Sequence, residues 1–535
     1  IKLDKSTWHA APCSGVLTLS YEVYAWDLSV RTAHLDTTHG YFNGTSVFVM
    51  VHGKESNAVT VDILPPSFNA ENWRVATSMR PAGAEPYGFG RYSAESYDEL
   101  IDHPVEMGTF ALATFDVMGV PHDIAINGHN KADIKRLCVD LKKICETEVR
   151  FFGALPKMDR YLFLVMVVGD GYGGLEHRAS CSLLCSRTDL PLLGDSEQSE
   201  SYRGFLGLCS HEYFHTWNVK QIKPAVFMPY DLTQEAYTRQ LWAFEGITSY
   251  YDDLILLRSG LIGVEDYLNL LAQGMSRVWM GGGRFKQSVA DSSFDAWTKF
   301  YRQDESSVNS IVSYYAKGSV IALALDLTIR QHTQNAHSLD DVMLRLWSEY
   351  GRAGVGVEEG VIEKVAAEVA GISLDAFFKQ YLYGTEDLPV AELLALVGVE
   401  FTLRPALSAD DKGGRGSGKA RSTPRVVLGA KSAADPAGVK LVNIFSGGAA
   451  ELAGLAAGDV VIALDQLKVA NGTLDAMLGQ YRESDLITAH AFRRDELMSF
   501  ELRLQSAPAD RVELNLKKEI DASALQWRNS WLSKR

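Results

Sequence analysis

Apolar and polar residues alternate in the first part of the chain. Over 17–25 the alternation has the two-residue period of a half-buried β-strand. Further β-rich runs at 47–51 and 59–64 are separated by Gly, Asn and Pro, which are typical of turns. An amphipathic helical pattern at 130–150 marks the end of the β-rich part of the chain. These patterns predict an all-β domain over residues 1–125.

Helical periodicity dominates the middle of the chain. Apolar residues recur at helical spacing in five segments: 199–219, 235–259, 311–332, 338–350 and 357–370. Before them, Tyr161–Val168 (YLFLVMVV) is an apolar run with the length of a strand, and it is too short to span a bilayer. Strands followed by helices predict an α+β domain over residues 126–405.

The last part of the chain returns to short strands. Residues 406–424 are rich in Gly, Ser, Lys and Arg and have almost nothing to bury, which predicts a flexible linker. Short apolar runs separated by glycines then predict a small β domain over 425–510. The charged tail, 511–535, contains Trp527 and Trp531 and is expected to pack back on the body.

Composition and charge limit the classes of partner. Hydrophobic residues make up 46% and charged residues 22%, as in an ordinary soluble globular protein. With 52 Lys and Arg against 67 Asp and Glu, the net charge of −15 argues against nucleic acid and anionic membranes as partners. The chain begins at Ile1 without a signal-like segment, so removal of a targeting peptide stays open. For a bacterial protein, cytoplasm and periplasm both remain open.

The segment HEYFH at 211–215 is the most informative for chemistry. On a helix, His211 and His215 share a face and can bind one metal ion, and Glu212 can hold the metal-bound water as general base. A catalytic zinc also needs a third protein ligand and one open position. Glu245 is the candidate, because its apolar, aromatic surroundings make an unpaired carboxylate costly.

Other interpretations of these residues exist. The HExxH pattern alone occurs by chance in helices of unrelated proteins. Glu245 could instead pair with an arginine such as Arg239, and Cys181 and Cys185 could suggest a metal pair. No second Cys or His pair with matching spacing follows those cysteines, so we interpret them as structural. The helical context and the buried downstream glutamate favour the zinc site.

Several segments together resemble the glycyl aminopeptidase family of zinc peptidases, which are relatives of the aminopeptidase N family. HEYFHTWNVKQIKP and WAFEGITSYYD carry the resemblance around the metal motif. Further matching segments are YEVYAWDLSVRTAHLD, GYFNGTSVF, GGLEHRAS and SYYAKGSVIALALDLTIR, in the family's order and over nearly the whole chain. The resemblance implies a thermolysin-like catalytic domain and a PDZ domain near the C-terminus. It also implies one zinc ion per chain, held as in gluzincins by His211, His215 and Glu245, with Glu212 as the base.

The resemblance implies further roles outside the metal motif. Gly173 and Gly174 lie where aminopeptidase N relatives have a Gly-x-Met-Glu-Asn motif, so Glu176 would bind the free α-ammonium of the substrate. Tyr315 would support the oxyanion. Without the resemblance, Glu176 reads as an exposed loop carboxylate and Tyr315 as a core aromatic. The 29 residues between His215 and Glu245 exceed those of aminopeptidase N relatives and could reshape the pocket.

The PDZ-like domain suggests a second binding site. PDZ domains add an extended peptide to a sheet edge and hold its C-terminal carboxylate in a backbone nest. Leu428, Gly429 and Ala430 stand where that carboxylate-binding loop would lie. A peptide or protein C-terminus is therefore a candidate partner, and a structural appendage is an equally good interpretation.

These observations predict a zinc-dependent aminopeptidase that acts on peptides with a free N-terminus, and the family resemblance implies that it removes small N-terminal residues, Gly or Ala. One alternative is a zinc endopeptidase on the same site. Another is a PDZ-bearing binding protein whose peptidase site is dead. Specificity beyond the family hint, the physiological substrate and the oligomeric state stay open.

Overall fold

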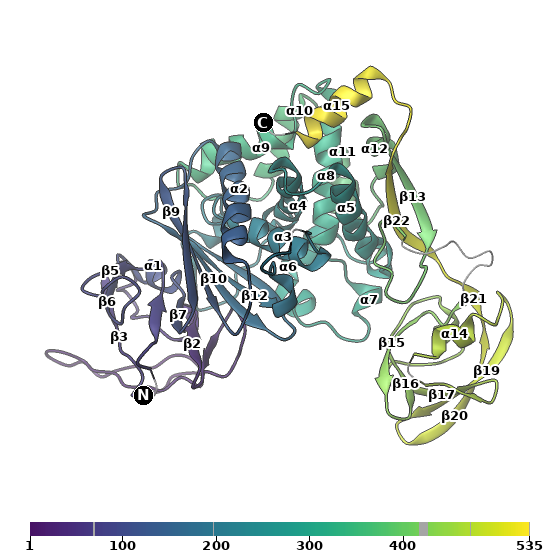
Figure 1. The fold of residues 1–535 in the computed structure, drawn as a ribbon, viewed down its shortest axis with the longest axis horizontal. Helices are drawn as coiled ribbons and strands as arrows, with labels where there is room; N and C mark the ends of the chain where they lie inside the picture. The colour runs from purple at the N-terminus through teal and green to yellow at the C-terminus, as the bar shows by residue number, and fades with distance from the viewer. Residues whose placement is uncertain (68–69, 196, 417–425, 471, 534–535) are drawn as a thin grey trace. The chain divides into compact units, whose positions relative to one another are not determined.

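Residues 1–111 and 112–535 form separate units in the computed structural model (Figure 1). The structure describes residues 1–67, 70–195, 197–416, 426–470 and 472–533. The second unit's sheet includes β8 (Ala111–Val117) and β9 (Val120–Asn127), so it begins before the domain boundary predicted at residue 125.

The first unit is built from strands, as its sequence pattern predicts. One antiparallel sheet has the order β1 (Ala33–Leu35), β2 (His39–Phe42), β7 (Val105–Gly108) and β4 (Arg74–Ala76). A second sheet has the order β3 (Val59–Ile63), β6 (Gly90–Ala94) and β5 (Arg80–Pro81). The short helices η1 (Gly44–Ser46) and α1 (Tyr97–Ile101) connect them. Val75, Tyr92 and Val105 belong to the buried core between these strands.

The strand predicted over 17–25 is wrong. These residues form no strand, and Leu17, Leu19 and Tyr21 are exposed. The run at 47–51 also forms no strand. Alternation suits a pleated surface, but a strand also needs a neighbour that takes up its backbone hydrogen bonds and a surface that buries one face. Such a neighbour exists for β3, which confirms the run predicted near residue 59.

The second unit is centred on a sheet with the order β11–β12–β10–β9–β8. The predicted strand is β10 (Tyr161–Val168), which is parallel to β9 and to β12 (Ser180–Ser186). Its residues are buried on both faces, which explains why its sequence is continuously apolar. At the edge of the described sheet, β11 (Tyr172–His177) runs antiparallel to β12.

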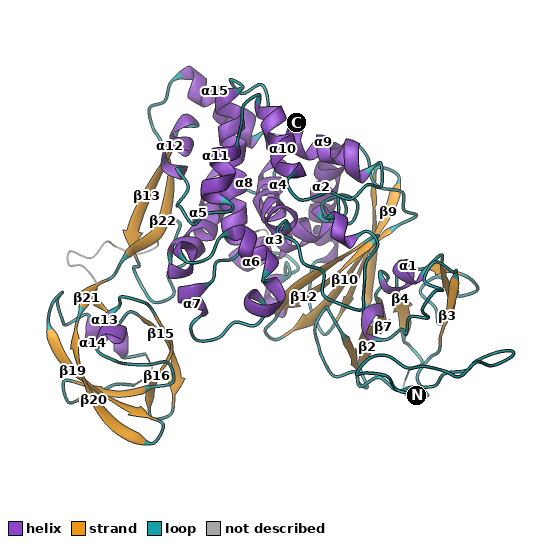
Figure 2. Cartoon of the chain, turned by 180° about the vertical axis from the view of Figure 1, so that it is seen from behind, coloured by secondary structure: helices purple, strands orange, loops and turns teal. Residues whose placement is uncertain are grey.

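Helices account for most of the rest of this unit (Figure 2). The α-helices are α2 (Ile134–Phe152), α3 (Glu200–Phe214), α4 (Thr248–Arg258), α5 (Val264–Trp279), α6 (Val289–Phe294), α7 (Ser307–Ser310), α8 (Ala316–His332), α9 (Leu339–Leu346), α10 (Val361–Ala370), α11 (Asp375–Tyr381) and α12 (Val390–Leu396). Shorter 3₁₀ and π turns are η2 (Arg187–Asp189), η3 (Ala225–Phe227), η4 (Trp242–Ile247), η5 (Gly282–Phe285), η6 (Ala296–Phe300) and η7 (Trp347–Gly351). This content confirms the α+β prediction.

The helix predicted over 235–259 starts late. Residues 235–240 run as a loop, because Thr238 Oγ1 and the Arg239 amide both donate to the Glu359 carboxylate at 2.9 Å. Helical backbone begins only around Trp242. The displaced start matters for the candidate site, since it leaves Glu245 near the beginning of the helical segment.

A small β module is inserted into the second unit. The chain leaves through β13 (Val399–Pro405) and returns through β22 (Ala509–Leu516), and these two strands pair with each other. The module contains β14 (Val426–Val427), β15 (Ala430–Asp435), β16 (Gly438–Ile444), α13 (Ala449–Leu452), β17 (Val460–Leu464), β18 (Leu467–Lys468), α14 (Leu474–Leu478), β19 (Leu486–Arg493), β20 (Glu496–Arg503) and β21 (Gln505–Ser506). Its core is its own and includes Leu441, Val461 and Leu502.

The predicted linker is partly held in place. Asp411 accepts hydrogen bonds from Arg404 at 2.6 and 3.2 Å, and the backbone amide of Arg415 donates to Asn269 on α5 at 2.8 Å. Residues 417–424 of the predicted linker lie outside the described residues.

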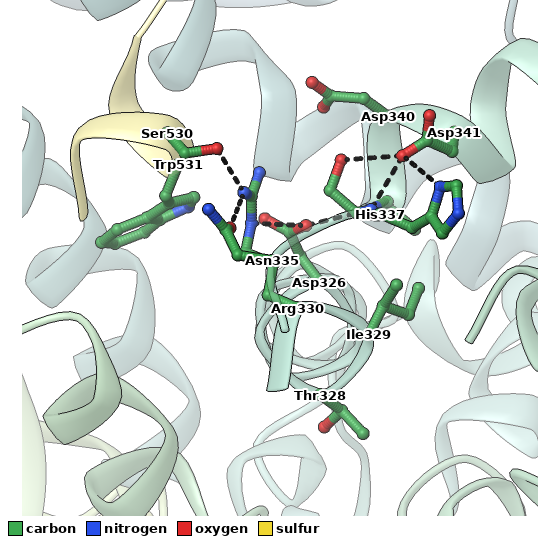
Figure 3. Close-up of polar contacts among 12 residues, drawn as sticks. Asp326, Thr328, Ile329, Arg330, Asn335, His337, Asp340, Asp341, Ser530 and Trp531 are labelled. Carbon is green, nitrogen blue, oxygen red and sulfur yellow. Dashed lines mark hydrogen bonds and ion pairs between the residues drawn. The ribbon is translucent and has the colours of Figure 1, made fainter. Parts of the chain in front are cut away.

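The C-terminal tail packs on the helices, as predicted. It forms α15 (Ala522–Leu532), and Trp531 is fully buried, with its indole donating to the Tyr250 hydroxyl at 2.9 Å. Arg330 bonds both Ser530 of the tail, at 3.1 Å, and Asp326 of its own helix, at 3.2 Å (Figure 3). The tail therefore braces α4 and α8, which both lie next to the candidate site. No helix in the described part of the chain is both long and apolar enough to cross a bilayer.

Candidate active site

The two motif histidines lie at the C-terminal end of α3. The helix starts at the N-cap Ser199, whose side chain accepts a hydrogen bond from the Tyr202 amide, and it is buried on most sides. His211 lies in its last turn and His215 directly follows it. Their Nε2 atoms lie 3.2 and 3.3 Å from the same oxygen, Oε2 of Glu245.

Glu245 is placed by a π-helical turn. The turn η4 leads directly into α4, and π turns inside helices are frequent at functional sites. A close approach fixes it against α8, because a Cβ at Gly246 would lie 2.6 Å from Gly318 Cα. Arg239 lies over the ring of Phe294 rather than beside Glu245, so Glu245 faces the histidines and not that arginine.

Two residues orient the imidazoles. Asp252 Oδ2 lies 3.2 Å from His211 Nδ1, and the Asn218 carbonyl accepts a hydrogen bond from His215 Nδ1 at 2.7 Å. The Asn218 side-chain amide also donates to the Ala243 carbonyl of the π turn at 3.1 Å, so it ties the second histidine to the element that carries Glu245. Both imidazoles thereby keep Nε2 for a metal.

Sequence reasoning missed both orienting residues. Asp252 follows Glu245 by seven residues, and that spacing returns to the same helix face after two turns, so it could have been found. Asn218 has no comparable signal, because it holds His215 through its backbone carbonyl, which every residue has, and its side chain bonds a turn far along the chain.

The donor set fits a catalytic zinc. One ligand atom each from His211, His215 and Glu245 lies within 4.8 Å of the other two. Two imidazoles and a carboxylate leave a fourth position for water or substrate, as catalytic zinc sites require. The structure therefore brings together all three predicted metal ligands.

Glu212 lies against the edge strand. It is 4% exposed, and its Oε2 has no hydrogen-bond partner among the described residues. A Cβ at Gly174 would lie 2.0 Å from Glu212 Oε1, so only glycine allows this approach. Burial raises the pKa of Glu212 to about 7, although His211 and His215 oppose this shift. A carboxylate with a free oxygen in this position can take a proton from water.

Glu176 comes from the same strand as Gly174. The two residues are two apart on β11 and so point to the same face. Carboxylate oxygens of Glu176 and Glu212 and a nitrogen of His215 lie within 4.8 Å of one another. Gly173 points to the opposite face and offers only its backbone. The arrangement places a second carboxylate beside the predicted metal ligands.

Tyr315 rather than Tyr314 faces the predicted metal ligands. The Tyr315 ring stacks on His211 with centroids 6.4 Å apart, whereas Tyr314 is 1% exposed in the core. Burial raises the pKa of Tyr315, so its hydroxyl remains a donor. The Tyr301 hydroxyl lies 2.9 Å from that of Tyr315 and accepts from that of Tyr314 at 3.3 Å. Tyr301 carries no sequence signal and was not predicted.

Comparison with known proteins agrees with this geometry. The model of the M61 glycyl aminopeptidase matches residues 204–321, and that of the peptidase M61 N-terminal domain matches residues 1–109. A crystal structure of an aminopeptidase N family protein from Idiomarina loihiensis is 42% identical, covers 95% of this chain and 85% of its own, and has a TM-score of 0.91. This chain belongs to the M61 glycyl aminopeptidase family.

A weaker similarity lies outside the M61 family. An M1 zinc metallopeptidase from Deinococcus radiodurans is 13% identical and covers 69% of this chain and 75% of its own. Its TM-score of 0.46 is too low to support a shared fold. None of the curated proteins compared matches this chain.

The predicted PDZ loop of this M61 family chain is a tight turn. Leu428 is buried and its carbonyl accepts from the Ala450 amide at 2.7 Å, while Ala430 pairs with Ile444 at the start of β15. Gly429 has a φ of +73°, and a Cβ there would lie 2.8 Å from the Cα of Gly448. Glycine is therefore required at this turn.

Proposed function

We propose that this M61 family chain is a zinc aminopeptidase that removes a small N-terminal residue, Gly or Ala, from peptides. The convergence of His211, His215 and Glu245 on one point, with Glu212 and Glu176 beside it, carries the proposal. The preference for small residues follows the family's description as glycyl aminopeptidases.

Each side chain has a distinct task in the proposed reaction. A zinc ion bound by the three ligands supplies Lewis acidity toward water and the peptide carbonyl. Glu212 holds the attacking water through its unpaired Oε2, takes its proton and passes it to the leaving amine. The Tyr315 hydroxyl donates a hydrogen bond to the carbonyl oxygen as negative charge develops there. Asp252 and Asn218 hold the two imidazoles in place.

Glu176 distinguishes an aminopeptidase from an endopeptidase. Its carboxylate can bind the α-ammonium only when the substrate has a free N-terminus, and its edge strand leaves a substrate backbone room to lie alongside. An endopeptidase has no use for a carboxylate at this place. The alternative of a dead binding protein requires that no zinc binds at His211, His215 and Glu245. Comparing the zinc content of the purified chain with that of the His211→Ala/His215→Ala protein tests this alternative.

Blocking the substrate's N-terminus is expected to stop hydrolysis. Acetylation removes the cation that Glu176 would bind, so glycyl anilide should be cleaved and acetylglycyl anilide should not. Glu176→Gln should lower kcat/KM for the free substrate about 30-fold or more, since breaking a buried charge pair costs about 2–5 kcal/mol.

Asp170→Asn is the matched control, because Asp170 is exposed in the turn before β11. It should leave hydrolysis unchanged. Equal cleavage of acetylated and free substrates would establish the endopeptidase alternative instead.

We further propose that the inserted β module is PDZ-like and binds a peptide C-terminus. Supporting this, β15 lies at one end of the module's described sheet, follows the turn at Gly429, and has mostly exposed side chains. A labelled peptide pool with free C-termini should bind the full chain, as measured by fluorescence anisotropy. The same pool with amidated C-termini should bind much more weakly. Equal binding of both pools, or none of either, favours a structural appendage.

A further inference from the structure

A second cluster of metal-ligating side chains lies in the N-terminal unit. It is formed by the β1–β2 hairpin, whose turn closes with the Asp36 amide donating to the His39 carbonyl at 3.0 Å. The pairing Leu35↔Gly40 puts Asp36 opposite His39, and His34 lies two residues before Asp36. Since alternate residues share a face and opposed residues point the same way, His34, Asp36 and His39 all lie on one face of the hairpin.

The three side chains converge at a place where both histidines are buried and Asp36 is partly exposed. One ligand atom from each lies within 4.8 Å of those of the other two. His34 is 7% and His39 2% exposed, and their rings stack with centroids 5.0 Å apart. Trp26 covers the His34 ring at 5.1 Å. His34 Nε2 lies 3.3 Å from Asp36 Oδ2, a separation that two ligands of one ion can have.

Asp36 is held so that one oxygen faces the histidines. Its Oδ1 accepts from the Thr38 amide at 2.7 Å, the Thr38 hydroxyl at 2.6 Å and the His39 amide at 3.1 Å. These hydrogen bonds saturate Oδ1 and leave Oδ2 on the side of the imidazoles.

His39 is oriented as metal-bound histidines usually are. Its Nδ1 lies 3.1 Å from Glu106 Oε1 on the neighbouring strand β7, and both side chains are almost fully buried. Its Nε2 is buried and has no hydrogen-bond partner among the described residues. A carboxylate that holds one ring nitrogen while the other points at the ion is the common arrangement behind a histidine ligand.

A metal-free ion pair explains the cluster less well. Without an ion, His39 Nε2 and His34 Nδ1 are both buried nitrogens without partners among the described residues, and each such atom costs about 1–3 kcal/mol. Binding an ion through His39 Nε2 satisfies at least one of them. Two imidazoles and a carboxylate, with no thiolate, suit a borderline divalent ion.

We propose that His34, Asp36 and His39 form a second metal site, separate from the candidate active site, that takes a divalent transition-metal ion such as Zn²⁺. The ion clamps the β1–β2 hairpin and stabilises the N-terminal unit. This proposal does not depend on the proposed peptidase function, because the two sites share no residue.

The experiment measures zinc in the full chain with the candidate active-site ligands removed. His211→Ala/His215→Ala protein is stripped with a chelator, equilibrated with Zn²⁺, desalted and analysed by mass spectrometry of its metal content. We expect one zinc per chain in this background. Adding Asp36→Asn should abolish it, since the amide keeps Oδ1 for the turn but replaces Oδ2. Adding His39→Gln should do the same.

A thermal measurement distinguishes loss of the metal site from misfolding of a variant. Zinc should raise the Tm of the His211→Ala/His215→Ala protein, because an ion that binds only the folded state stabilises it. The shift should vanish with Asp36→Asn and persist with His52→Gln, a control at a histidine that is 96% exposed in the same unit. Absence of zinc from the background protein, or retention of zinc by both the Asp36→Asn and His39→Gln variants, overturns the proposal.

Discussion

Glu212→Gln is expected to lower kcat about 10²–10⁴-fold, the usual contribution of a positioned general base. The amide has nearly the same shape but cannot take the proton of the attacking water. The ligands His211, His215 and Glu245 are untouched, so the zinc content should equal that of the wild-type chain. Steady-state hydrolysis of glycyl anilide and metal analysis of the same sample check both halves of this prediction.

Glu200→Gln is the matched control for this experiment, because Glu200 is exposed at the start of the same helix. Gly174→Ala provides a second route to the same defect. An added Cβ would lie 2.0 Å from Glu212 Oε1 and must push the carboxylate aside without changing its chemistry. If Glu212→Gln retains turnover within a few-fold of wild type, Glu212 is not the base and the mechanism fails.

Tyr315→Phe should lower kcat about 10²–10³-fold, the typical effect of losing one donor to a developing oxyanion. KM should change little, since the hydrogen bond strengthens mainly in the transition state. The ring that stacks on His211 is retained, so folding and zinc content should survive. Steady-state kinetics, with kcat and KM resolved, are the measurement.

Tyr314→Phe is the internal control for the tyrosine experiment. The Tyr314 hydroxyl bonds that of Tyr301, and its ring is in the core, so its loss should affect turnover only a few-fold. A crippled Tyr314→Phe beside a normal Tyr315→Phe would mean that the two roles are exchanged. Normal turnover in both variants would assign the oxyanion to another group.

Local sequence was enough for the features that depend on spacing along one element. The four-residue separation of His211 and His215 puts both on one helix face wherever that helix lies. The continuously apolar strand β10 is similarly determined, because burial on both faces leaves no room for polar side chains. Glu245 could be selected because a carboxylate in an aromatic, apolar helix needs a partner.

Sequence patterns predicted wrongly, or did not predict at all, the features that depend on a contact with a distant part of the chain. Residues 17–25 alternate in polarity but form no strand. The helix expected from residue 235 starts late, because the backbone amide of Arg239 donates a hydrogen bond to the Glu359 carboxylate. The side chains of Asn218 and Tyr301 contact residues outside their own helix or strand, so no helical or strand periodicity predicts these contacts.

The candidate metal ligands could thus be selected from the amino-acid sequence, whereas their orientation was decided by tertiary structure. For the β module, the short apolar runs predict strands, but only the pairing of β13 with β22 shows that the module is an insertion. Tertiary structure also decides the grouping of His34, Asp36 and His39, where the register of one hairpin and the position of Glu106 on another strand create the cluster. Spacing along a helix or strand is a property of the local backbone, but convergence of side chains depends on how separate elements pack, which no local pattern records.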